Sequence, residues 1–408
     1  MPQLPFGWAP RIMLVAWWIY AINGYRPPWQ PIIVSDADSG AALRKLIFGL
    51  SGMAALAVLF LGRRLGPALM RQLPLTVLAV GMLGSVVWSD SGGLTIKRGA
   101  IFVFALLTMA VAVDDHPEPV RFMQKVVIWM TGGAAWISLV GMVIFPKLAT
   151  SIAERPGLCG VTGHPNTLGA VLSSGYLVSL GLRSRTHREF FCYLGLRGGQ
   201  ILALFLSNSV TSLILVVSGT GLFLFLWGPH RLRGQIQVAA VTGITLVMLI
   251  GPANCKSMAF KLVGRDESLS GRDELWKEVF REGMKSPVFG RGYGAFWREG
   301  RGREIVGTWN PRQSHNAYVD VFVDIGVVGL FVVVFSLVSP LPRLVILRAR
   351  LNEEGRRTVC ASATLATGLL VIYAFGESYL LKTDKVPMLC LMWTSMVLRS
   401  DDPCLRMD

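Results

Sequence analysis

Two histidines attract attention because an asparagine follows each of them within two residues. The strings are Gly163-His164-Pro165-Asn166 and Ser314-His315-Asn316. A neutral imidazole, whose ordinary pKa is about 6.5, can take a proton from an attacking hydroxyl group near neutral pH. A histidine at the start of a helix can equally serve as a hydrogen-bonded cap, and the spacing alone leaves both interpretations open. His164, His315, Asn166 and Asn316 are therefore candidate site residues.

Five arginines in separate loops form a second candidate group: Arg98, Arg155, Arg272, Arg291 and Arg312. The planar fork of a guanidinium group matches two phosphate oxygens at once. As a set, these arginines indicate a clamp for a pyrophosphate. Taken singly, each is also explained by contact with lipid headgroups or by loop solubility.

Acidic residues at the ends of apolar stretches form a third group. Asp320 and Asp324 lie one helical turn apart, and Glu377 ends another stretch. Acidic residues within membrane segments favour a functional role, although pairing with a nearby arginine is the alternative. Asp36 and Asp38 leave open a divalent metal site, but no third acidic ligand accompanies them.

The elements that must position these residues are transmembrane helices. The 408 residues are 52% hydrophobic and only 16% charged, with a mean hydropathy of +0.51, whereas soluble domains carry about 25% charged residues. This composition excludes an ordinary soluble enzyme and predicts an all-α, polytopic integral membrane protein with about twelve transmembrane helices. Eleven or thirteen helices remain open, as does a cleaved signal peptide over residues 1–24. The expected spans are 11–24, 44–62, 73–88, 99–113, 121–145, 166–182, 190–206, 210–228, 235–252, 316–338, 358–376 and 385–398.

The net charge of +15 comes mainly from short loops between these spans, so it predicts membrane orientation rather than nucleic-acid binding. One set of alternating loops holds roughly twice as many Lys and Arg residues as the other. We expect that set, and both termini, to be cytoplasmic. The predicted parts are an N-terminal transmembrane bundle of about nine helices (1–252), a large outer loop (253–315), and C-terminal transmembrane helices with a short cytoplasmic tail (316–408).

The outer loop is predicted to contain an amphipathic helix over residues 270–286. Ser270 and Asp273 have the spacing of a capping box, and Pro287 is expected to stop the helix. The glycines of residues 290–294, GRGYG, predict a tight turn rather than a dinucleotide-binding loop. The expected apolar face of the helix is made of Leu275, Trp276, Val279, Phe280 and Met284.

Several of these strings together resemble a known family. Residues 262–276 read LVGRDESLSGRDELW, residues 287–297 read PVFGRGYGAFW, and SHNAY at 314–318 is followed by DIGVVG at 324–329. Upstream come Trp88-Ser89 with Arg98, and then Arg155 through HPNTLG at 164–169; downstream comes Gly376-Glu377-Ser378. The combination resembles the O-antigen ligase and polysaccharide polymerase superfamily, and is most like its exopolysaccharide repeat-unit polymerases.

The resemblance implies an all-helical membrane glycosyltransferase of the bacterial inner membrane, with its active site on the periplasmic side. The implied donor is a glycan on undecaprenyl pyrophosphate, and the implied acceptor is a lipid-linked repeat or a lipid A core. The reaction would be inverting and metal-independent, without a cofactor, and polysaccharide export machinery would be a further partner. His315 inherits the role of general base and Arg272 that of pyrophosphate contact. The residues expected to bind substrate are Arg98, Arg155, His164, Asn166, Arg291, Arg312, Asn316 and Glu377.

One string departs from the family pattern. In Ser207-Asn208-Ser209-Val210-Thr211, Val210 stands where the family usually has a cationic residue. Arg98 or Arg155 would then have to supply the missing charge, unless the activity has changed.

Several functions stay open at this point. The exopolysaccharide-type strings favour a polymerase over an O-antigen ligase. Asp36 and Asp38 support a metal-dependent transferase that uses a lipid-linked donor. The number of spans is also that of a polysaccharide transporter or flippase, although transporters usually place their polar sites near the middle of the membrane.

Overall fold

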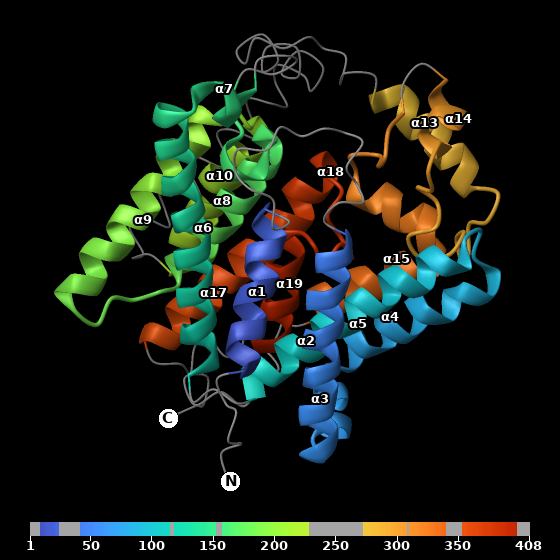
Figure 1. The fold of residues 1–408 in the computed structure, drawn as a ribbon, viewed down its shortest axis with the longest axis horizontal. Helices are drawn as coiled ribbons and strands as arrows, with labels where there is room; N and C mark the ends of the chain where they lie inside the picture. Colours follow the sequence, from blue (N-terminus) through green and yellow to red (C-terminus); the bar gives the residue numbers. More distant parts are fainter. Residues whose placement is uncertain are drawn as a thin grey trace.

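A computed structural model describes residues 9–23, 41–114, 118–151, 157–227, 272–307, 310–339 and 353–397 and shows a largely α-helical chain (Figure 1). The helices are α1 (Ala9–Asn23), α2 (Ala41–Leu61), α3 (Leu65–Arg71), α4 (Leu73–Gly84), α5 (Gly92–Asp114), α6 (Pro119–Ile144), α7 (Pro146–Ala149), α8 (Pro165–Leu180), α9 (His187–Leu206), α10 (Val210–Trp227), α13 (Arg272–Gly283), α14 (Arg301–Val306), α15 (Ala317–Val338), α17 (Glu353–Gly368), α18 (Ala374–Gly376) and α19 (Val386–Val397). Shorter elements are the 3-10 helices η1 (Ser85–Trp88) and η2 (Gly160–Thr162), the π-helix η3 (Leu369–Tyr373), and an antiparallel pair of two-residue strands, β1 (Thr150–Ser151) and β2 (Gly157–Leu158).

Each predicted span that lies in the described residues overlaps a helix, which confirms the mostly helical fold, although α5 begins seven residues and α17 five residues before the predicted start. Apolar runs of this length form helices because a helix satisfies its own backbone hydrogen bonds, as the membrane interior requires. Six described helical stretches are long and apolar enough to cross a membrane: Gly92–Ala112, Val120–Ile144, His187–Leu206, Val210–Trp227, Ala317–Val338 and Glu353–Gly376. A seventh is counted if Phe48–Leu61 and Leu65–Arg71, which are bent by 109°, form one span. The total of about twelve stays a prediction, and the expected span 235–252 lies outside the described residues.

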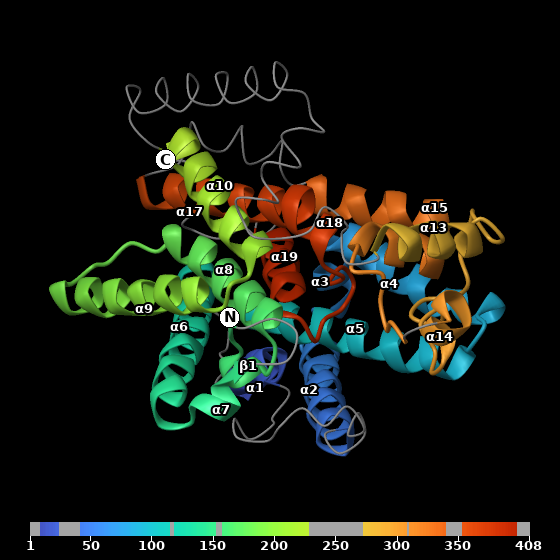
Figure 2. The ribbon, with the colours of Figure 1, turned by 90° about the horizontal axis from the view of Figure 1, so that it is seen from above.

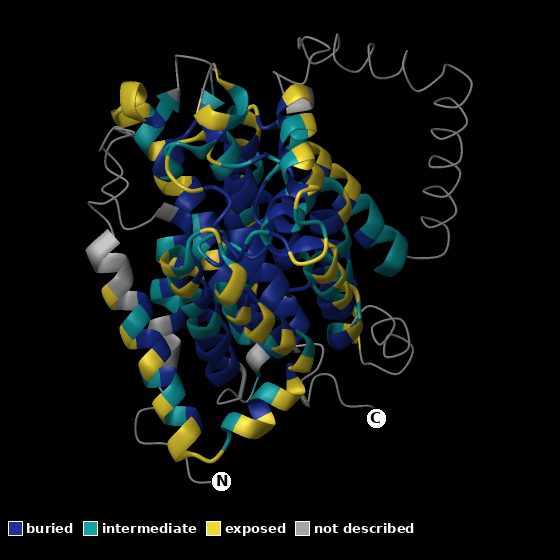
Figure 3. Cartoon of the chain, turned by 90° about the vertical axis from the view of Figure 1, so that its right-hand side faces the viewer, coloured by how far each residue is buried: buried dark blue, intermediate teal, exposed yellow. Residues whose placement is uncertain are grey.

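The helices form two groups with α19 between them. Figures 1 and 2 show α6, α8, α9 and α10 on one side and α4, α5, α13, α14 and α15 on the other. The residues of α19 from Met388 to Met392 are almost completely buried, and Figure 3 shows buried residues concentrated in the centre. Trp17 of α1 stacks on Phe48 of α2 with ring centroids 3.9 Å apart. These packed side chains fix the helices that carry the polar residues.

The two ends of the bundle differ in what they carry. Figure 1 shows α7, α13, α14 and α18 at one end and α3 at the other. Around the starts of α6, α9 and α17, the buried Arg121 guanidinium pairs with Glu189 at 3.0 Å and also with Glu354, while Arg185 pairs with Glu118 at 3.1 Å. These ion pairs join three segments at the end predicted to be cytoplasmic.

The loop after α13 is hydrogen-bonded into a break in α15. Gly326 has φ 69° and ψ −173°, which interrupts the helix. The backbone N–H of Val327 donates instead to the carbonyl of Pro287 over 2.8 Å. A Cβ atom at Gly326 would lie 2.2 Å from the Val288 carbonyl oxygen, so only glycine fits this approach. The loop and α15 are therefore held as one unit.

The predicted helix 270–286 is present as α13, which ends at Gly283, before Pro287. Leu275 and Val279 are buried against α15 and the following loop, whereas Phe280 and Met284 are about half exposed. The apolar face predicted from the sequence is thus only partly buried. Ser270 of the expected capping box lies outside the described residues.

Candidate functional site

His315 occupies a strained backbone position at the start of α15. Its φ of 56° lies in the left-handed region, which costs a non-glycine residue of the order of 1–3 kcal/mol. Both neighbours are fixed: the Trp276 indole N–H of α13 donates to the Ser314 carbonyl over 2.8 Å, and the Asn316 side chain caps α15. These contacts maintain the strain and set the direction of the imidazole.

Four of the predicted site residues form one polar chain across three separate segments. Nδ1 of His315 lies 3.6 Å from Oε2 of Glu377. The other Glu377 oxygen accepts a 3.0 Å hydrogen bond from Nδ2 of Asn166. The backbone N–H of Asn166 in turn donates to Nδ1 of His164, which caps α8. His164 is therefore a helix cap, and it also belongs to the chain that leads to His315.

The same nitrogen of His315 also faces Gln313, which leads to Lys382, and sequence reasoning selected neither residue. Nε2 of Gln313 lies 3.4 Å from Nδ1 of His315, and Oε1 of Gln313 accepts from Nζ of Lys382 over 3.1 Å. Lys382 also lies 3.5 Å from Oδ2 of Asp320. Asp320, expected to orient polar groups or pair with an arginine, pairs with this lysine and accepts from the indole N–H of Trp297 over 2.9 Å. The one available signal was the position of Lys382, five residues after Glu377.

Arg98 supports the glycine-rich turn that the sequence predicted. Gly290, Gly292 and Gly294 all have positive φ, which confirms a tight turn. The Arg98 guanidinium donates to the Gly294 carbonyl. The nearby Tyr293 hydroxyl donates to the Leu381 carbonyl over 2.6 Å, and burial raises the pKa of Tyr293, so the hydroxyl stays protonated as a donor.

Arg291 is bound by two carboxylates. Its guanidinium lies 3.1 Å from Asp90 and 3.1 Å from Glu282. Glu282 also pairs with Arg301 and accepts from Lys285, and this hydrogen bond with Lys285, ahead of attraction to the two arginines, holds the pKa of Glu282 below its ordinary value. Arg291 therefore joins the turn to α13 and to the segment before α5.

The remaining three arginines differ in what the structure describes. Arg312 is exposed and forms no ion pair with another described residue. Arg272 is the first residue of α13, but its side chain lies outside the described part of the structure. Arg155 lies outside it entirely, as do Asp36 and Asp38.

A polar cavity of about 250 Å³ lies beside Asp320 and Lys382. Its walls come from α5, the glycine-rich turn, α15 and the segment after α18. Charges of both signs line it, together with the ring of Trp297. The charged side chains are Lys97, Arg98, Arg312, Asp320, Asp324, Lys382 and Asp384.

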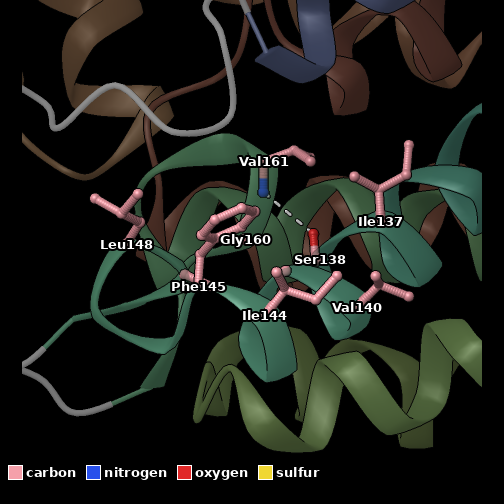
Figure 4. Close-up of a pocket in the computed structure, with 10 residues that line it drawn as sticks. Ile137, Ser138, Val140, Ile144, Phe145, Leu148, Gly160 and Val161 are labelled. Carbon is pink, nitrogen blue, oxygen red and sulfur yellow. Dashed lines mark hydrogen bonds between the residues drawn. The ribbon is translucent and has the colours of Figure 1, made fainter.

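A second hollow, of about 210 Å³, is almost entirely apolar. It lies at the end of α6, beside α7 and η2 (Figure 4). Its one polar side chain, Ser138, accepts from the backbone N–H of Val161 over 3.1 Å. We call it the apolar groove; its walls are Ile137, Ser138, Val140, Gly141, Ile144, Phe145, Leu148, Ala149, Gly160 and Val161.

The arrangement around His315 is suited to proton transfer. One ring nitrogen faces a carboxylate, and none of the described residues hydrogen-bonds the other nitrogen, Nε2. The side chain is 29% exposed, so a substrate group can reach it. A carboxylate that orients an imidazole and stabilises its protonated form is a recurring arrangement for a general base.

Comparisons with known proteins agree with the motifs. Residues 199–334, which run from α9 into α15 and include Arg272 and His315, match a family described as O-antigen ligase. The exopolysaccharide production protein ExoQ of Rhizobium meliloti (strain 1021) is 22% identical over 277 residues, which are 62% of this chain and 61% of that protein. The match thus spans less than two thirds of the relative's length. Both comparisons confirm the resemblance read from the sequence: this multi-pass membrane protein is similar to the O-antigen ligase family over residues 199–334 and to an exopolysaccharide production protein over a longer stretch.

Proposed function

We propose that the protein is a membrane glycosyltransferase that polymerises undecaprenyl-pyrophosphate-linked oligosaccharide repeats into exopolysaccharide or O-antigen. The observation that carries this proposal is the polar chain through His164, Asn166, Glu377 and His315. It gathers at one end of the bundle, the end predicted to face the periplasm, as interfacial chemistry requires. The similarity to an exopolysaccharide production protein supports an exopolysaccharide as the product.

The proposed reaction is a displacement at the anomeric carbon of the donor. A hydroxyl of the acceptor glycan attacks this carbon and gives its proton to Nε2 of His315. The bond to the pyrophosphate oxygen breaks on the opposite face, the leaving pyrophosphate takes the electron pair, and the configuration inverts. Glu377 stabilises the imidazolium that forms, and a positioned base of this kind contributes about 10²–10⁴-fold to the rate.

Cationic side chains stabilise the charge that develops on the leaving pyrophosphate. We assign this contact to Arg272, as the family resemblance implies, and to Arg312, whose exposure at the cavity supports the assignment. Substrate contacts of Arg98, Arg155 and Arg291 stay predictions. The internal contacts of Arg98 and Arg291 favour a role in holding the turn.

The apolar groove is the proposed place for part of the hydrocarbon chain of the donor. Val161 lines the groove, and the chain continues through Gly163 to His164, three residues later. A groove without charge beside a polar chain suits a lipid that has an apolar tail and a charged head. Its position therefore supports a lipid-linked donor.

A ligase that transfers the glycan to a lipid A core is the second candidate, and the description of the matching family favours it. The lipid-linked sugars that accumulate when the protein is removed separate the two functions. Single repeats accumulate if a polymerase is lost, whereas long chains stay on the carrier if a ligase is lost. Restoration by the wild type but not by a membrane-inserted His315→Ala variant is expected, and equal restoration by both would contradict the proposal.

A metal-dependent transferase and a transporter predict different results. Glycan transfer by the purified protein is expected to continue in EDTA, and its loss would favour a metal site at Asp36 and Asp38. Uptake or flipping of lipid-linked glycans in liposomes, without any transfer, would favour a transporter.

A further inference from the structure

The polar cavity contains a charge arrangement that the family motifs do not include. We propose that it is an anion-binding subsite for a phosphate or pyrophosphate group, with Lys382 as its principal cation and Asp320 as a fixed counter-ion that competes with the bound anion. The inference rests on the proposed function only for the identity of the anion.

The cations of the cavity are not equally available to a ligand. Arg98 already donates to the Gly294 carbonyl, and Lys97 has an interaction partner within the protein. Arg312 and Lys382 remain: the first is exposed, and the second is about one-third exposed. An ammonium group has three donors, and the described contacts of Lys382 with Gln313 and Asp320 leave one for a ligand.

The pairing of Lys382 with Asp320 is long, at 3.5 Å, and Asp320 does not depend on it. The other carboxylate oxygen of Asp320 accepts from the backbone N–H of Ser314 and from the indole of Trp297, each over 2.9 Å. Asp320 is therefore fixed in place by neutral donors. Its charge holds the ammonium group beside the cavity and competes with an incoming anion for it.

The backbone around Lys382 is held as firmly as that around His315. Leu381 has a φ of 62°, a strained value for leucine, and its carbonyl accepts from the buried Tyr293 hydroxyl. Strained positions of this kind cluster at ligand sites. Gln313 lies between Lys382 and His315: its Oε1 accepts from Nζ of Lys382 over 3.1 Å, and its Nε2 lies 3.4 Å from Nδ1 of the imidazole. An anion held at Lys382 would therefore lie in the cavity next to the residue that contacts the base.

The test measures binding rather than catalysis, with full-length protein in nanodiscs and two probes, inorganic pyrophosphate and undecaprenyl pyrophosphate. Lys382→Gln is compared with Lys385→Gln, which makes the same change three residues away at a lysine outside the cavity lining. Lys382→Arg retains the charge, and Asp320→Asn removes the counter-ion but retains an oxygen for Trp297.

We expect Lys382→Gln to weaken binding by roughly tenfold or more, since a charge-assisted hydrogen bond is lost. Lys385→Gln should bind as the wild type does, and Lys382→Arg should retain most of the affinity. Asp320→Asn should bind about threefold or more tightly, because competition for the ammonium group is removed. If both probes bind, the pyrophosphate group alone is sufficient for binding. If only undecaprenyl pyrophosphate binds, the lipid tail is needed to bring the headgroup to the cavity. Either result, with the expected effect of Lys382→Gln, supports the subsite.

Equal affinities of Lys382→Gln and Lys385→Gln would overturn the inference. If Asp320→Asn does not fold, the comparison of the three lysine variants still tests whether Lys382 binds the anion. Lys382-dependent binding without any glycan transfer would leave the subsite standing and remove the proposed function. Glycan transfer that needs His315, together with pyrophosphate binding that Lys382→Gln does not change, would support the proposed function and exclude the subsite.

Discussion

Replacing Glu377 with glutamine removes the negative charge that faces the candidate base. The substitution retains the shape of the side chain and an oxygen that can accept the hydrogen bond from Asn166. The polar chain can therefore stay connected while the charge beside His315 is lost. We expect glycan transfer to become slower because the imidazolium formed during proton transfer is no longer stabilised.

The size of the effect follows from the distance between the two groups. Nδ1 of His315 and Oε2 of Glu377 are 3.6 Å apart, with side chains 29% and 16% exposed. At that distance two unit charges attract by about 1 kcal/mol in bulk water and by about 5 kcal/mol at an effective dielectric constant near 20. Partial exposure places the interaction between these limits. A loss of about 1–4 kcal/mol corresponds to a rate roughly 5- to 1,000-fold lower.

The assay is glycan transfer from a lipid-linked donor by protein reconstituted in liposomes. We expect kcat to fall while KM changes little, because the charge acts on the transition state rather than on substrate binding. Glu377→Asp should retain part of the rate. Glu299→Gln, the same change at an exposed carboxylate in the loop after α13, serves as the control and should leave the rate unchanged. A Glu377→Gln variant as fast as this control would refute the role of the carboxylate.

Three further predictions concern other parts of the structure. Gly326→Ala should lower the free energy of unfolding by about 2 kcal/mol or more, since alanine disfavours this φ and its Cβ would meet the Val288 carbonyl; thermal unfolding in detergent no different from that of Gly93→Ala, a site with open space, would contradict this. Gly141→Phe should fill the apolar groove, since a Cβ there meets only Ala149 at 3.9 Å, and should raise KM for long polyprenyl donors but not for short ones; an equal change for both would exclude the groove. Because the folded-state pKa of Glu282 is lowered, its stabilisation is complete above its ordinary pKa of about 4.5 and is lost as the pH falls through the folded value. Glu282→Gln should therefore be less stable than the wild type at pH 7, and a difference that persists in strong acid would contradict the assignment.

The positions of the helices could be predicted from the sequence because apolar length alone identifies membrane helices. The break in α15 could not. Residues 316–338 were predicted as one continuous span, and the interruption at Gly326 depends on backbone contacts with Pro287 and Val288, nearly 40 residues earlier. Nothing in the local pattern distinguishes this glycine from one that lies inside a regular helix.

The candidate site could be predicted only in part, because its contacts also join residues that are distant in the sequence. His315 was selected because an imidazole suits proton transfer, and Glu377 and Asn166 were selected because they lie in strings that resemble the family motifs. The fold brings the three together from distant segments. The pairing of Lys382 with Asp320 joins residues 62 positions apart, so no local spacing reveals it. Residue type also does not predict whether an arginine such as Arg291 is available to a substrate or is already paired with the protein's own carboxylates.

The most direct measurement of the central claim is the rate of glycan transfer by His315→Ala in the same liposomes as the wild type. Both proteins must insert to the same extent and unfold at the same temperature. The proposed role of the imidazole predicts that the variant loses at least about a hundredfold in kcat. A variant that transfers glycan at the wild-type rate would show that proton removal does not depend on this histidine.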